Sequence, residues 1–184
     1  MSEELLVRHC SPTLAGMKTG NIFSCSYSEL SELREFIRNL NLRLVKKGLR
    51  VVPIRATEGR ALIYVYRPKH LERDLKNDTA VQLLNQCDYN IASADKCVNC
   101  LICRLKEKCE FPHEIGLFLG YPPEDVCGFI ENRAEDFKCV GTWKVYGDAE
   151  SAQKTFARYK KCTDVYCAKF AEGRPLDKLA VSDR

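Results

Sequence analysis

Residues 30–48 read LSELREFIRNLNLRLVKKG and, with the two apolar runs that follow them, decide the fold. Leucine or isoleucine recurs every three or four residues, at Leu30, Leu33, Ile37, Leu40 and Leu44. This spacing places one apolar stripe along a helix, so the sequence predicts an amphipathic helix that ends near Gly48. Ser26 and Glu29 have the spacing of a capping box, which predicts the start of the helix just after them.

Two short runs of β-branched and aromatic residues follow this helix, at 50–57 and 60–67. Glu58-Gly59 separates them, and a glycine-containing turn between two such runs predicts a β-hairpin. Pro53 lies inside the first run. Because proline cannot donate a ladder hydrogen bond, the first run is expected to be an edge strand or to carry a bulge.

The remaining segments add two strands and several helices. Strands are expected over 21–27 and 138–146, and helices over 3–10 (ending before Pro12), 68–87 in two pieces, 94–108, 112–120, 122–132 and 149–171. The order β-α-β-β, several helices, then β-α predicts an α+β fold with about four mostly antiparallel strands covered by helices. No linker or repeat interrupts the chain, so one domain is expected over residues 1–174, followed by a polar, frayed tail over 175–184.

The composition of the 184-residue chain, 45% hydrophobic and 29% charged, is that of a soluble globular protein. A net charge of +4 permits an anionic ligand but falls short of a dedicated nucleic-acid binder. The expected helix over 122–132 also carries three acidic residues, Glu124, Asp125 and Glu131, which would repel phosphates. No apolar run reaches membrane-spanning length and no secretory signal is visible, so a cytoplasmic protein without a membrane partner is expected.

Eleven cysteines, an odd number, argue against a disulfide framework. Four of them form a cluster with two, two and five intervening residues: Cys97, Cys100, Cys103 and Cys109. Thiolates at such spacing can ligate a metal, and this pattern favours an iron–sulfur cluster over zinc. The alternative is a plain amphipathic helix, in which the apolar side chains share one face and unligated thiols share the other.

Residues 111–122, FPHEIGLFLGYP, are the least generic stretch of the chain. His113 and Glu114 lie at the expected start of a helix, where backbone amides and the helix dipole favour an anion. They are a candidate acid/base pair for catalysis. The alternative is that Pro112 starts the helix and both side chains have structural roles, because adjacent residues on a helix point about 100° apart.

A second candidate site lies near the start of the chain. Cys10 could act as a nucleophilic thiolate, with a base supplied from elsewhere in the fold. Thr13 and Lys18 belong to a polar turn that could hold a phosphate or a carboxylate, although it lacks the spacing of a P-loop. The alternative is a capped turn around Pro12.

Several of these blocks together resemble the domain-of-unknown-function family 3793 of anaerobic bacteria. The resemblance is carried by four blocks: 9–16 with Lys18; 111–122 with Asp125, Val126, Gly128, Phe129, Ile130 and Asn132; 143–147; and 159–162. It implies an anaerobic, cytoplasmic setting and a common pocket built from residues near Cys10, His113 and Lys144. The cysteine cluster is not among the features that the resemblance covers.

Three functions remain open from the sequence. The first is a binding or redox accessory module that holds an iron–sulfur cluster or zinc through the four clustered cysteines. The second is a binding protein for a small anionic ligand, or a thiol-dependent enzyme, with a pocket around Cys10, Lys18, His113 and Glu114. The third is a structural or interaction protein without metal.

Overall fold

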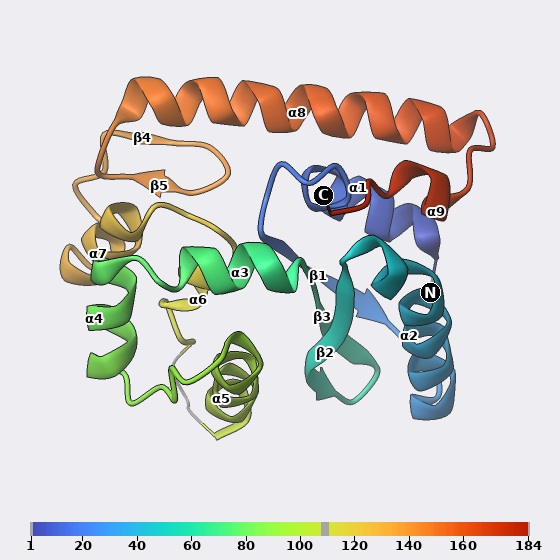
Figure 1. Cartoon of the computed structure of the whole chain (residues 1–184), viewed down its shortest axis with the longest axis horizontal. Coiled ribbons are helices and arrows are strands. Elements are labelled where there is room, and N and C mark those ends of the chain that lie inside the picture. Colours follow the sequence, from blue (N-terminus) through green and yellow to red (C-terminus); the bar gives the residue numbers. More distant parts are fainter. Residues whose placement is uncertain (1, 108–110, 184) are drawn as a thin grey trace. The chain divides into compact units, whose positions relative to one another are not determined.

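The computed structural model describes residues 2–107 and 111–183. The chain divides into two compact units (Figure 1): residues 1–69 with 161–184 form unit 1, and residues 70–160 form unit 2. Both units combine helices with antiparallel strands, so the expected α+β fold class is confirmed. Whether the units behave as the one expected domain stays a prediction.

Unit 1 is built on a three-stranded antiparallel sheet with the order β1-β3-β2. Its first five elements are α1 (Glu3–Leu14), β1 (Gly20–Ser26), α2 (Leu30–Leu44), a 3₁₀ turn η1 (Val45–Lys47) and β2 (Arg50–Thr57). The middle strand β3 (Arg60–Tyr66) and helix α9 (Leu176–Leu179) also belong to this unit. Strand β2 lies at the edge of the sheet and its register shifts between Pro53 and Arg55, as the proline predicts.

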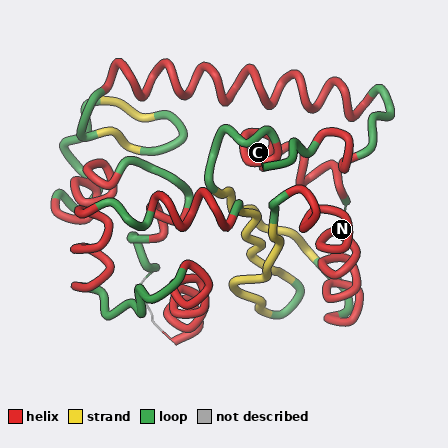
Figure 2. The backbone as a smooth tube through the Cα atoms, in the orientation of Figure 1, coloured by secondary structure: helices red, strands yellow, loops and turns green. Residues whose placement is uncertain are grey.

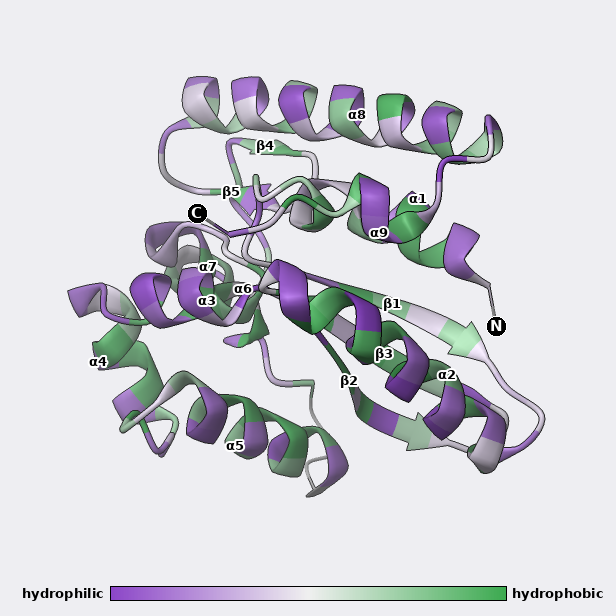
Figure 3. Ribbon diagram, turned by 45° about the vertical axis from the view of Figure 1, so that its right-hand side comes forward, coloured by the Kyte–Doolittle hydropathy of each residue, from purple (hydrophilic) through white to green (hydrophobic). Residues whose placement is uncertain are grey.

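The core of unit 1 lies between helices and one face of this sheet. Four of the five predicted stripe positions of α2 are buried, whereas Leu30 at the start of the helix is 43% exposed. Helix α1 contributes Leu6, Cys10 and Leu14. Phe23 of β1 and Ile63 of β3 belong to the same apolar cluster, because alternate residues of a strand point to the same face. Figure 3 shows the resulting alternation of hydrophobic and hydrophilic residues along α2.

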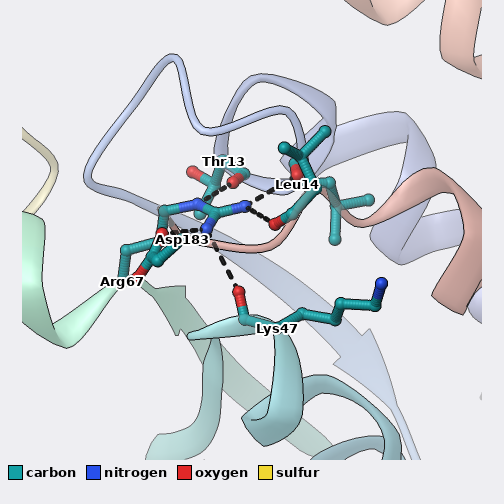
Figure 4. A network of polar contacts seen from close by, with 6 residues as sticks. Thr13, Leu14, Lys47, Arg67 and Asp183 are labelled. Carbon is teal, nitrogen blue, oxygen red and sulfur yellow. Dashed lines mark hydrogen bonds and ion pairs between the residues drawn. The ribbon is translucent and has the colours of Figure 1, made fainter.

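Arg67, directly after β3, is fully buried and binds segments that lie far apart in the sequence (Figure 4). Its guanidinium donates hydrogen bonds to the backbone oxygens of Thr13, Leu14, Lys47 and Val181. It also forms an ion pair with the carboxylate of Asp183. Three of the carbonyl contacts are 2.7 or 2.8 Å long. This single side chain therefore joins the end of α1, η1 and the C-terminal segment to the sheet.

Unit 2 consists mainly of short helices (Figure 2). They are α3 (Pro68–Asp74), α4 (Asp78–Gln86), α5 (Ala94–Glu107), α6 (Ile115–Phe118) and α7 (Pro123–Glu131). A two-stranded hairpin, β4 (Cys139–Val140) and β5 (Lys144–Val145), leads into α8 (Ala149–Ala171), whose last turns belong to unit 1. None of the described helices is both long and apolar enough to cross a membrane.

Five local predictions were wrong. The helix expected over 112–120 is limited to α6, and Pro112 and His113 precede it. The N–H groups of Ile115 and Gly116 bond three residues back, as in turns, so no α-helix starts at the proline.

Helix α1 does not end before Pro12 but continues to Leu14, because a proline removes only one donor and the last turn is buried. Glu29 is the N-cap of α2 and its side chain makes no capping hydrogen bond, so the capping box is absent. The segment expected as one strand over 138–146 is a hairpin, since the turn closes with the Gly141 N–H donating to the carbonyl of Trp143.

The fifth error concerns the predicted frayed tail over 175–184. Residues 176–179 form α9, and Leu176 and Leu179 are buried in the core of unit 1. Their spacing of three residues places both on one side of a helical turn, which is enough to dock a segment of mostly polar sequence.

Candidate functional site

A pocket of about 200 Å³ opens in unit 2, between the segment before α6, helix α7 and the β4–β5 hairpin. Apolar side chains of α6 and α7 form part of its wall. The other described lining residues are mainly aromatic and include a lysine: Phe111, His113, Tyr121, Phe129, Trp143 and Lys144. These residues come from three segments that are separated in the sequence.

The aromatic side chains are arranged in two pairs. The His113 and Phe129 ring centroids are 5.0 Å apart with an interplanar angle of 60°. Tyr121 and Trp143 stack with centroids 4.9 Å apart and an angle of 29°. Phe156 of α8 packs edge-on against the indole at 4.6 Å. Such offset and edge-to-face contacts are the preferred geometries of aromatic pairs, so the walls support one another.

Asp125 of α7 fixes the hairpin and the indole ring in place. The carboxylate is buried, with 3% of the residue exposed. Oδ2 accepts a hydrogen bond of 2.6 Å from Trp143 Nε1, and Oδ1 accepts two of 2.7 Å from the backbone N–H groups of Tyr146 and Gly147. Three donors therefore stabilise this buried charge, and Asp125 acts as the link between α7 and the pocket wall.

Gly128, one turn further along α7, allows the hairpin to approach the helix. A Cβ atom at this position would lie 2.5 Å from Cγ of Tyr146. Glycine inside a helix is unfavourable by roughly 1 kcal/mol relative to alanine, so this position is explained by the packing of the tyrosine ring and not by helix formation.

Replacing Asp125 by asparagine is expected to lower the free energy of unfolding by about 2–3 kcal/mol and to shift the emission of Trp143 to longer wavelength. The amide nitrogen of asparagine is a donor, so one side of the new group would face a donor whichever way it is oriented. Urea denaturation and the tryptophan emission spectrum measure both effects. Glu131→Gln, an exposed carboxylate on the same helix, is the control. Equal behaviour of the two variants would contradict the role of Asp125.

Of the predicted site residues, His113 and Lys144 come together in this pocket. Glu114 does not join them. It is buried, forms an ion pair of 2.7 Å with Arg104 Nε and accepts a 3.1 Å hydrogen bond from the Tyr89 hydroxyl. Burial and this neighbouring carboxylate raise the pKa of Tyr89. His113 and Glu114 thus face different surroundings, and Glu114 links α5 to the segment before α6.

The N-terminal candidates lie in unit 1. Cys10 and Lys18 are both buried, at 0% and 3% exposure, and interact electrostatically with each other. Burial raises the pKa of the Cys10 thiol and lowers the pKa of Lys18 to about 7. Lys18 Nζ donates to the carbonyl of Gly20 at 2.8 Å, and the Thr13 hydroxyl donates to Asn21 Oδ1 at 2.7 Å. A buried thiol of raised pKa disfavours a thiolate nucleophile.

A pocket shared by residues near Cys10, His113 and Lys144 stays a prediction, because the first lies in unit 1 and the other two in unit 2.

The cysteine cluster falls largely on α5, which is a continuous helix. Cys97 is buried and donates to the carbonyl of Asn90, whereas Cys103 is exposed. The two thiols therefore lie on different faces of the helix. Among the described residues no three His, Cys, Asp or Glu side chains lie close enough together to hold a metal ion. Cys109 lies outside the described residues. The iron–sulfur or zinc site stays a prediction.

Sequence reasoning did not assign Tyr121, Asp125, Phe129 or Trp143 to a site. All four belong to the blocks that carry the family resemblance, and this membership is the sequence feature that could have identified them. Periodicity could not find them, since the aromatic residues meet only after the hairpin has packed on α7.

A protein-family model described as "Protein of unknown function (DUF3793)" matches residues 6–180. The match includes every residue of the pocket, and it confirms the resemblance seen in the sequence. No curated protein and no solved structure matches the chain.

Proposed function

Since the chain belongs to the DUF3793 family, whose description gives no function, we propose a function from the pocket: the protein binds a small, planar, largely apolar molecule among these aromatic side chains. The observation that carries the proposal is the pair of aromatic walls around a cavity of about 200 Å³. Pockets lined by apolar and aromatic groups with a few polar side chains are typical of small-molecule sites.

The size of the cavity limits the ligand to one or two rings. An apolar protein cavity of about 150 Å³ is large enough to bind benzene. The pocket here is somewhat larger, and it is partly open through Phe111, which is 47% exposed. A single substituted aromatic ring is therefore the molecule that fits best.

This proposal does not use the thiol of Cys10, because its burial and raised pKa disfavour a reactive thiolate. Binding alone, without a covalent step, is proposed. The cytoplasmic, anaerobic setting stays a prediction that rests on the family resemblance.

The cysteine cluster supports a separate hypothesis, a bound iron–sulfur cluster or zinc ion, which rests on sequence spacing alone. Iron and zinc analysis of protein purified without oxygen tests it independently of the pocket.

Benzyl alcohol, a neutral single-ring probe, is expected to shift the indole N–H resonance of Trp143 in a saturable way, with a Kd of roughly 0.1–10 mM. Trp143 is the only tryptophan of the chain, so its indole N–H gives one assignable peak in a ¹H–¹⁵N spectrum. This N–H donates to Asp125 beside the pocket and will respond to a ring bound there.

Phe129→Ala is expected to raise the Kd of benzyl alcohol at least tenfold, because the substitution removes one wall of the pocket. Phe36→Ala, in unit 1 and not part of the pocket, is the matched control. A peak that does not move, or equal binding by the two variants, would refute the proposed function.

A further inference from the structure

Among the residues that the structure describes, Lys144 is the one lysine that lines the pocket, and its ammonium group lacks an acidic partner there. Nζ donates a hydrogen bond of 2.6 Å to the carbonyl of Ala134. It also lies 4.5 Å from the ring centroid of Phe137 and 6.0 Å from that of Phe129. No carboxylate that the structure describes is within 4.0 Å of it.

A half-buried ammonium in these surroundings favours an anionic ligand. The group has three N–H donors, and the described contacts use one. Aromatic faces attract a cation but accept only weak hydrogen bonds. A negatively charged oxygen would supply both the missing counter-charge and a strong acceptor.

The backbone that holds Lys144 is unusual. Arg133, Ala134 and Asp136 are not glycines, yet they have positive φ angles of 49°, 65° and 56°. Such conformations are strained for residues that carry a side chain, and they concentrate at functional sites. Here the strained loop presents the Ala134 carbonyl to Nζ, which fixes the ammonium beside the pocket.

Asp125, which is also charged and lines the described part of the pocket, does not favour a cationic ligand. The Asp125 carboxylate already accepts hydrogen bonds from the Trp143 indole and from two backbone N–H groups. Lys144 itself lies over the face of Phe129, where a cationic ligand would bind. A second positive charge there would be repelled.

We propose that the ligand is a small aromatic acid whose ring binds between the aromatic walls and whose carboxylate pairs with Lys144. This inference rests on the proposed function, because it names the class of molecule that the same pocket holds. It makes Lys144 the residue that sets ligand charge, whereas the aromatic walls set ligand shape.

Three probes of equal ring size test the proposal: benzoate, benzyl alcohol and benzylamine at pH 7, each titrated against the indole N–H peak of Trp143. Benzoate is expected to bind at least tenfold more tightly than benzyl alcohol, and benzylamine more weakly than both. Lys144→Met is expected to remove the preference for benzoate while benzyl alcohol still binds, which also shows that the variant is folded.

Two further variants separate the local contact from general charge. Lys138→Met removes an exposed lysine of the same segment, whose Nζ donates to the carbonyl of Gly147, and should keep the preference. Lys144→Arg retains the positive charge and should keep most of the preference for benzoate.

The outcomes are distinguishable. Saturable binding of all three probes with equal affinity, or tightest binding of benzylamine, would overturn the aromatic-acid inference and leave the proposed function standing. No binding of any probe would overturn both. Loss of the benzoate preference in Lys138→Met to the same extent as in Lys144→Met would also overturn the inference, because the preference would then reflect net charge.

Discussion

Arg67→Met is expected to lower the free energy of unfolding by about 3–5 kcal/mol, the usual cost of removing one partner of a buried ion pair. All five N–H donors of this fully buried guanidinium are used, four on backbone carbonyls and one on Asp183. Methionine fills much of the space but offers no donor. The carbonyls and the carboxylate would lose their partner in a place that water does not reach.

Urea denaturation followed by far-UV circular dichroism measures this effect. Arg60→Met is the matched control, because Arg60 is exposed and makes one long hydrogen bond of 3.4 Å, to Ser24 Oγ. We expect it to change stability by less than about 0.5 kcal/mol. Arg67→Lys keeps the charge with fewer donors, so its free energy of unfolding should lie between those of Arg67→Met and Arg60→Met. A methionine variant as stable as the control would mean that the network contributes no net stability.

The second large effect is a dependence of stability on pH that originates at Lys18. Burial lowers the pKa of this lysine in the folded protein to about 7, whereas its ordinary value is 10.5. The nearby Cys10 thiol opposes this shift but does not overcome it. Between these two pH values the unfolded chain binds a proton that the folded protein does not. The free energy of unfolding therefore rises with pH above 7, by at most ~1.4 kcal/mol per pH unit.

Above pH 9 the trend is expected to reverse. Burial raises the pKa of Cys10, Cys25 and Cys162 above the ordinary thiol value of 9.0. In this range the unfolded chain loses protons that the folded protein retains, so stability falls with pH. The two effects together predict a stability maximum near pH 9.

Urea denaturation at pH 6, 7, 8 and 9 tests this prediction. Lys18→Met should remove most of the rise between pH 7 and 8.5 and should be more stable than the unsubstituted protein at pH 6, where the buried ammonium is charged. Lys46→Met, an exposed lysine of η1 in the same unit, should keep the rise. If the slope survives in Lys18→Met, the titrating group lies elsewhere.

The secondary structure of unit 1 followed closely from its sequence. The start of helix α2 and both strands of the β2–β3 hairpin were predicted within one residue, because apolar spacing and the Glu58-Gly59 turn are local signals. The α-helix itself ends at Leu44, and the 3₁₀ turn η1 continues to the predicted stop at Gly48. The errors at Pro12 and in the C-terminal segment have one cause. Local rules end a helix at a proline and leave a polar tail frayed, but burial of Leu14 and Leu176 in the core overrides both.

The pocket could be predicted only in part. The sequence predicted a candidate site in the stretch around His113, and the family resemblance added Lys144 to the candidates. No sequence pattern distinguishes Tyr121, Phe129 and Trp143, which also line the pocket, from ordinary core residues, because aromatic side chains are usually buried in the core. Likewise nothing in the sequence separates His113, which lines the pocket, from Glu114, which pairs with Arg104.

By itself the sequence determined the α+β class, the order of most helices and strands and the family, because each depends on local periodicity or on motifs read along the chain. Only the tertiary structure decided which of the candidates share a pocket and which further side chains line it. Asp125 must bind the hairpin before the rings of three separate segments can enclose a cavity, and only packing decides that Arg67 and Lys18 are buried. Burial changes the energy of a charge by several kcal/mol, and no local pattern records it.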